Sequence, residues 1–102
     1  MVQKIYKIMK DIYDPEIPLN FIDLGLIKSI TLNGNEVNIV MTLTSPECPL
    51  KDVIVQNIQS RILSEIENVE KVNIYFDFTK VWTASNISKE GREKLKKLGW
   101  NL

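Results

Sequence analysis

The 102-residue sequence contains no histidine and only one cysteine, Cys48. The absence of histidine excludes zinc sites built on imidazole, cysteine–histidine and serine–histidine nucleophile pairs, and acid–base catalysis by histidine. One cysteine cannot form a disulfide within the chain, and a free thiol is typical of a reducing compartment. We therefore expect a cytoplasmic protein whose only strong nucleophile is a thiol.

Net charge and long apolar runs are also missing. Thirteen basic residues balance thirteen acidic ones, so the chain as a whole lacks the positive charge that attracts nucleic acids or anionic membranes. No segment approaches the roughly twenty apolar residues of a membrane span, and the N-terminus carries lysines where a signal peptide would be apolar. Neither nucleic acid nor a membrane is expected as a partner.

The pattern of apolar residues predicts one domain over residues 1–102. Helical spacing predicts helices over the first dozen residues, over 50–66, and in a short segment that ends at Gly99. Alternation predicts strands over 26–32, 37–43 and 72–78, and the Asn33-Gly34-Asn35 turn joins the first two as a hairpin. The predicted fold class is α/β (α+β): a two-layer sandwich with helices on one face of a three-stranded mixed sheet. We expect the third strand to pair in parallel with a hairpin strand.

The segment 14–25 is predicted to be a loop packed on the core, because it combines two prolines with several apolar residues. It carries Asp14, Glu16 and Asp23, and Glu47 stands beside the cysteine. Such carboxylates are candidate hard ligands for a metal beside one soft sulfur. Each also has a structural interpretation: Asp14 can cap or end the first helix, Asp23 can bind its own turn, and Glu16 can be solvated.

Cys48 lies between the second strand and the second helix. Pro49 fits the first helical position, which predicts Cys48 at the N-cap, where unpaired backbone N–H groups favour an anion. A helix N-terminus lowers the pKa of a thiol, and the thiolate is the form that binds metal or attacks. The alternative is that Cys48 is a small buried apolar residue. Trp82 is expected to be a packing anchor.

Three groups of residues carry a resemblance to a known family. They are Asp14-Pro15-Glu16 with Asp23-Leu24-Gly25-Leu26, then Thr44 with Cys48-Pro49, then Trp82 ahead of Ser88, Gly91, Leu95 and Gly99. Together they span nearly the whole chain and resemble the iron-sulfur cluster assembly domain family, which includes the SufT and PaaD proteins. The resemblance implies a domain that assists maturation of iron-sulfur proteins. It also implies that Asp14, Glu16 and Asp23 lie near Cys48 and that Thr44 lines the same site.

An iron-sulfur cluster usually has four thiolate ligands, and this chain supplies one. The predicted function is therefore an accessory factor that binds iron or a cluster transiently through Cys48 and delivers it to client proteins. The cluster would be shared in a homodimer or with a client or a component of the assembly machinery. Cys48, Thr44 and Asp23 are the predicted binding residues, and Asp14, Glu16 and Glu47 are further candidate metal ligands. No enzymatic turnover is expected.

Two alternatives remain open from the residues. The domain can be an adaptor that docks clients to the assembly machinery without binding metal, with Cys48 as a packing residue. It can also be a thiol peroxidase that passes through a sulfenic acid. The lack of a second cysteine and of any histidine argues against the peroxidase.

Overall fold

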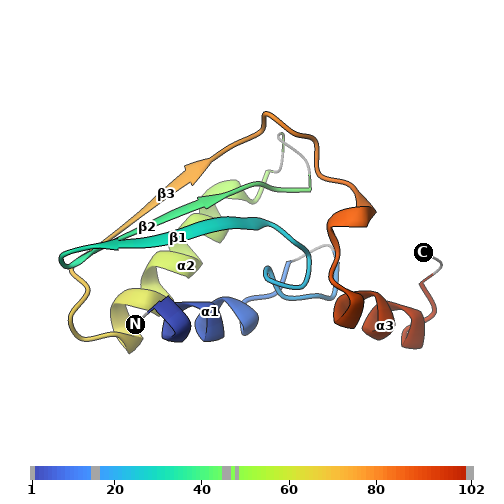
Figure 1. The fold of residues 1–102 in the computed structure, drawn as a ribbon, viewed down its shortest axis with the longest axis horizontal. Coiled ribbons are helices and arrows are strands. Elements are labelled where there is room, and N and C mark those ends of the chain that lie inside the picture. The colour runs from blue at the N-terminus through green and yellow to red at the C-terminus, as the bar shows by residue number, and fades with distance from the viewer. Residues whose placement is uncertain (1, 15–16, 45–46, 48, 101–102) are drawn as a thin grey trace.

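The order of helices and strands is the predicted one, with a short 3-10 helix added. The computed structural model describes residues 2–14, 17–44, 47 and 49–100. Along the chain lie α1 (Val2–Lys10), β1 (Ile27–Asn33), β2 (Glu36–Met41), α2 (Lys51–Glu65), β3 (Lys71–Phe76), η1 (Ala84–Asn86) and α3 (Lys89–Lys97). Figure 1 shows their arrangement.

The three strands form one mixed sheet in the order β1-β2-β3. β1 pairs antiparallel with β2, and β2 pairs parallel with β3, in register from Glu36 and Lys71 to Met41 and Phe76. The predicted parallel pairing is confirmed. As a consequence, β2 and β3 end at the same edge of the sheet, and the segments that follow them leave side by side (Figure 1).

The hairpin between β1 and β2 turns on Gly34 and Asn35. Gly34 has φ +65°, whereas Asn33 ends β1, and no described residue other than glycine has a positive φ. A single left-handed residue at the first turn position matches a type II′ turn. The predicted hairpin is confirmed, but only Gly34 of the Asn33-Gly34 pair has a positive φ.

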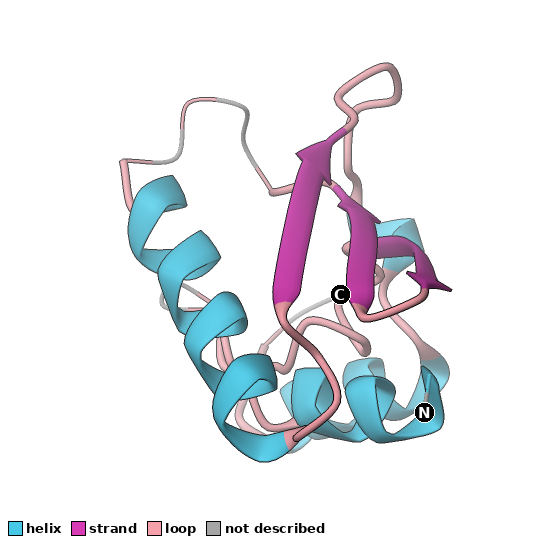
Figure 2. Cartoon of the chain, turned by 90° about the vertical axis from the view of Figure 1, so that its left-hand side faces the viewer, coloured by secondary structure: helices cyan, strands magenta, loops and turns pink. Residues whose placement is uncertain are grey.

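The core lies between one face of the sheet and the helices α1 and α2 (Figure 2). The residues that meet there are fully or almost fully buried: Ile5, Ile8 and Met9 from α1, Val37, Ile39 and Met41 from β2, and Ile54, Ile58 and Ile62 from α2. The opposite face is polar, and Asn73 Nδ2 donates to Asn38 Oδ1 across β2 and β3 (3.0 Å). The predicted two-layer arrangement is confirmed for α1 and α2.

The predicted packing of the loop before β1 on the core is also confirmed. Leu19, Phe21, Leu24 and Leu26 are completely buried. The backbone around them is paired through the Leu24 N–H to Asn20 O (3.1 Å) and the Leu26 N–H to Phe21 O (3.2 Å). The loop is therefore a fixed part of the core and supports what packs on it.

Helix α3 does not cover the sheet but lies beyond its end (Figure 1). Only Gly91 and Leu95 of this helix are buried, and so narrow an apolar stripe cannot cover a sheet face. The helix begins after its N-cap Ser88, whose hydroxyl accepts from the Gly91 N–H (3.0 Å). Its position contributes to an elongated molecule of 43 × 25 × 20 Å.

Two glycines allow the segment from η1 to α3 to approach the loop before β1 closely. Gly25 has φ +72°, and a Cβ there would overlap the Asn86 carbonyl oxygen. A Cβ on Gly91 would lie 3.1 Å from Leu19 Cδ1 and 3.2 Å from Asp23 Cβ. A methyl group at either position would thus force these segments apart.

In the described part of the chain, no helix is long and apolar enough to cross a membrane.

Gly25→Ala is expected to lower the free energy of unfolding by about 2 kcal/mol or more, because the new methyl adds a collision to left-handed strain. Gly34→Ala is the matched control, since its φ is similar but nothing lies within 4 Å of the added Cβ. It should cost about 1 kcal/mol from strain alone. Urea unfolding measures both, and equal losses would show that contact with Asn86 contributes nothing.

Candidate functional site

The candidate site lies where β2 and β3 end, and we call it the sheet-end site: residues 20–25, 42–44 and 78–82. Hydrogen bonds join its segments. The Thr42 N–H donates to Leu26 O (2.8 Å), and the Trp82 indole Nε1 donates to Leu24 O (2.7 Å). Trp82 is thus a partly buried anchor, as predicted, and it ties the chain after β3 to the turn before β1.

Thr44 lies at a small hollow in this site. The hollow has a volume of about 20 Å³ and is lined by Thr42, Leu43, Thr44, Phe78, Lys80, Val81 and Trp82. This volume is enough for about one water molecule. Anything larger must bind at the surface of these residues.

Helix α2 begins at the same end of the sheet. The Phe76 and Phe78 rings are stacked with centroids 5.8 Å apart, and Lys51 Nζ lies 4.7 Å from the Phe76 centroid and 5.8 Å from that of Phe78. An ammonium over an aromatic face is attracted by the ring quadrupole. Thr44 and Lys51, which flank the segment that contains Cys48, are therefore both held at this end of the sheet.

The predicted start of α2 is wrong by two residues. Leu50 is the N-cap residue, and its side chain makes no capping hydrogen bond. The Ile54 N–H donates to Leu50 O (2.9 Å). Pro49 therefore precedes the helix and does not occupy its first position, and the N-cap predicted for Cys48 belongs to Leu50. Cys48 and Glu16 lie outside the described residues.

Asp23 is the centre of a buried polar network. Its carboxylate accepts from Asn20 Nδ2 (2.9 Å), Ser88 Oγ (3.0 Å) and Lys94 Nζ (3.4 Å). Its own N–H donates to Asn20 Oδ1 (2.9 Å), and its carbonyl accepts from the Ser88 N–H (2.7 Å). The residue is only 5% exposed. Asp23 therefore binds its own turn, as one interpretation predicts, and also fixes the start of α3.

These contacts set the ionisation of Asp23. Burial on its own would raise the pKa of the carboxyl group. The hydrogen bonds from Asn20 and Ser88, with the hydrogen bond and charge of Lys94, outweigh burial and hold the pKa below the ordinary value of 3.8. The folded protein thus favours a carboxylate at this position.

Asp14 is buried and fixes the loop, but it does not cap α1. That helix ends at Lys10, and Asp14 Oδ1 accepts from the Ile17 N–H (3.0 Å). The Asp14 N–H donates to Leu19 O (3.0 Å). Capping or ending the first helix is therefore not the role of Asp14, because three residues lie between it and the helix end at Lys10.

The described residues hold no cluster of three acidic, cysteine or histidine side chains that could bind a metal ion. Asp14 and Asp23 are buried, whereas Glu47 is exposed. Among the predicted site residues that the structure describes, only Thr44 lines the hollow directly. Asp23 is connected to the hollow through its neighbour Leu24, whose carbonyl accepts from Trp82. Their roles toward a metal or a cluster stay predictions.

The sequence analysis did not identify Lys51, Asn20 or Lys94 as parts of this region. Asn20 lies three residues before Asp23, which is the spacing of a side-chain turn and was a usable signal. No pattern in the neighbouring sequence predicts the contacts of Lys94 or Lys51, because each contacts residues from a distant segment of the chain.

Asp77 was also missed by the sequence analysis. Hydrogen bonds from the Thr79 hydroxyl and backbone, then from Lys28, lower the pKa of its carboxyl group to about 2.

Comparison with known proteins identifies the family. Residues 2–74 match the family model described as iron-sulfur cluster assembly protein. The chain belongs to this family. The predicted resemblance is thus confirmed.

Three similar proteins illustrate the relationship. A protein of Porphyromonas gingivalis named "Fe-S protein maturation auxiliary factor" is 34% identical over 91% of this chain and 89% of its own length. An "Iron-sulfur cluster carrier protein" of Synechocystis is 27% identical over 69% of this chain, which corresponds to only 20% of that protein. The structure of a conserved hypothetical protein of Thermotoga maritima has a TM-score of 0.78 at 32% identity, with 93% of both chains covered.

Asp23→Asn is expected to lower the free energy of unfolding by about 1–3 kcal/mol at neutral pH, because buried donors lose a charged acceptor. The lowered pKa means that the contribution of Asp23 is present above the ordinary value of 3.8 and is lost as pH falls through the lower folded value. The difference between the two proteins in urea unfolding should therefore shrink as the pH falls below the ordinary value of 3.8. Glu93→Gln, an exposed control on α3, should change stability by less than about 0.5 kcal/mol at neutral or acidic pH. A pH-independent loss in Asp23→Asn would contradict the role of the charge.

Proposed function

We propose that this protein is an accessory factor in iron-sulfur protein maturation, which carries iron or a cluster transiently on Cys48 and passes it to a client. The observation that carries the proposal is that Thr44 and Lys51, the residues on either side of segment 45–50, both lie at the sheet-end site. Thr44 on one flank lines the hollow, and Lys51 on the other flank lies against Phe76 and Phe78. The names of the relatives support a role in maturation and delivery.

The cargo must be held jointly in this proposal. One thiolate falls short of the usual four ligands of a cluster. A second copy of the chain, a client or the assembly machinery would supply the others, and Asp14, Glu16 or Glu47 would supply oxygen ligands if the cargo is iron. The hollow of about 20 Å³ is too small to enclose a cluster, which fits a shared cargo at the surface. No turnover chemistry is proposed.

Anaerobic reconstitution with iron and sulfide tests this function. The unmodified protein should gain visible absorbance with stoichiometric iron and sulfide, and its mass in solution should show whether two chains share the cargo. Cys48→Ala should lose this absorbance while its circular dichroism and urea unfolding stay unchanged. Absorbance that persists in Cys48→Ala, or that never forms in the unmodified protein, would contradict cluster binding through this residue.

An adaptor that binds no metal is the second candidate. The observation that favours it is that two predicted ligands have structural roles: Asp14 accepts from the Ile17 N–H, and Asp23 accepts from Asn20, Ser88 and Lys94. For an adaptor, Cys48→Ala should support the activity of iron-sulfur enzymes in cells that lack the native gene as well as the unmodified protein does. A carrier should fail in the same assay.

A further inference from the structure

The neutral net charge conceals an uneven distribution. Six of the thirteen basic residues but only two of the thirteen acidic ones lie between residues 80 and 97. This stretch therefore has a formal charge of +4, and the rest of the chain has −4. The positive charge is concentrated on α3 and the segment that leads to it.

Two of these six cations are used inside the fold. Arg92 Nη2 donates to Ala84 O (2.9 Å), and Lys94 Nζ lies 3.4 Å from Asp23 Oδ2. The other four, Lys80, Lys89, Lys96 and Lys97, are exposed and form no ion pair with any residue that the structure describes. Their charges are available to a partner.

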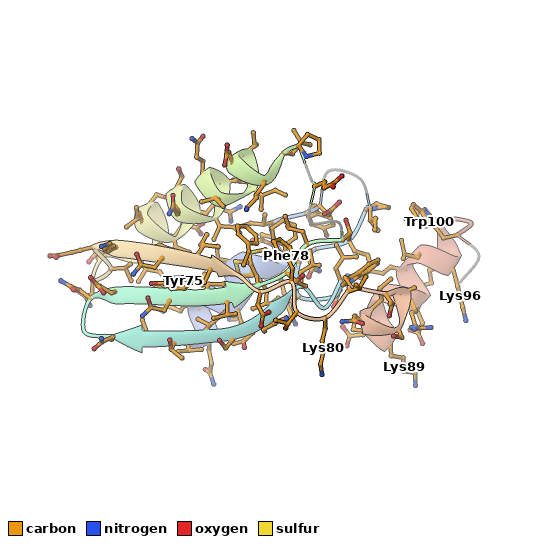
Figure 3. The ribbon with its side chains drawn as sticks, turned by 90° about the horizontal axis from the view of Figure 1, so that it is seen from above. Tyr75, Phe78, Lys80, Lys89, Lys96 and Trp100 are labelled. Atoms are coloured by element: carbon orange, nitrogen blue, oxygen red, sulfur yellow. The ribbon has the colours of Figure 1, made fainter. Side chains whose placement is uncertain are left out.

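Three of these lysines project toward the same side of the molecule. Figure 3 shows Lys80, before η1, and Lys89 and Lys96, on α3, pointing the same way. Lys89 and Lys96 are seven residues apart, which places them on one face of the helix about two turns apart. We call Lys80, Lys89 and Lys96 the basic surface.

Exposed apolar side chains lie at the end of the same helix, away from these charges. Leu98, directly after α3, is 62% exposed, and Trp100 is 42% exposed. Figure 3 shows Trp100 on the side of α3 opposite to Lys80, Lys89 and Lys96. The basic surface is therefore a surface of charge, which suits a partner that offers carboxylates.

We propose that the basic surface docks an acidic segment of a protein partner. A protein segment fits better than a nucleic acid, because Glu90 and Glu93 stand among the lysines of α3. These carboxylates would repel a continuous phosphate chain, whereas a peptide can present its carboxylates at separate points. Complementary charge of this kind steers encounter and selects the partner.

The location of the basic surface connects it to the sheet-end site. Asp23 joins the turn of that site to Ser88 and Lys94 of α3, so a partner on α3 is held beside the site. The proposal rests on the proposed function in one respect: the docked protein would be the client or assembly component that shares the cargo.

Fluorescence anisotropy with a short labelled peptide rich in glutamate tests the docking. The peptide should bind, and added salt should weaken the binding. The charge reversal Lys80→Glu/Lys89→Glu/Lys96→Glu should weaken it about tenfold or more. The matched control is Lys4→Glu/Lys7→Glu/Lys10→Glu, which makes the same charge change at exposed positions of α1. It should change binding less than about twofold, since exposed charges far from a contact are screened.

Leu98→Ala is a second control, because Leu98 follows Lys96 by two residues and so lies about 200° around the helix from it. It should change binding less than about twofold. Equal weakening by both triple variants would overturn the proposal, and so would absence of peptide binding. Tighter binding of a single-stranded oligonucleotide or of phosphatidylserine vesicles, lost in the same variant, would assign the surface to those partners instead.

Cluster uptake in the same variants separates the two proposals. The charge reversal Lys89→Glu/Lys96→Glu, which leaves Lys80 at the hollow unchanged, should weaken peptide binding and leave anaerobic cluster uptake unchanged, and Cys48→Ala should leave peptide binding unchanged. An unmodified protein that takes up a cluster but does not bind the peptide overturns the docking alone. Intact peptide binding in a protein that takes up no cluster overturns the carrier function alone.

Discussion

The carboxylate of Asp23 is the interaction on which the arrangement of the sheet-end site depends. It accepts hydrogen bonds from the turn that contains it and from Ser88 and Lys94, which lie 65 and 71 residues later in the sequence. Gly25 and Gly91 allow the backbone to come close enough for these bonds. A buried carboxylate is stable only with such partners. The same network therefore explains both the burial of the charge and the position of α3.

The layers of the fold could be predicted from the sequence because they follow from periodicity. Ile54, Ile58 and Ile62 recur at helical spacing, and Val37, Ile39 and Met41 alternate, so each pattern determines which face is buried. The place of α3 could not be predicted in this way. Its few apolar residues predict a helix but do not indicate which segment the helix packs against. Its attachment depends on polar contacts with a distant turn.

The candidate site was predictable only in part, for a similar reason. Asp23 binds its own turn, as local sequence spacing indicates, whereas the place of Thr44 at the site was implied by the resemblance to the family. The start of α2 at Lys51 was missed because proline is common at the first helical position, whereas Pro49 precedes the N-cap Leu50. The contact of Lys51 with Phe76 and Phe78 joins a helix to a strand about 25 residues away. No pattern in the neighbouring sequence predicts such a contact.

The attachment of α3 to a turn, and not to the sheet, has a consequence for how the family can diversify. Residues 2–74, which match the family model, contain α1, β1, β2, α2 and most of β3, whereas α3 lies outside them. Leu95 is the one apolar side chain of α3 that is buried in the hydrophobic core, and the rest of the helix, apart from Gly91, faces away from it. The outer face of α3 can therefore change its charge and its apolar residues without altering the sheet. Evolution could adjust partner choice on this helix separately from the chemistry of the cysteine segment.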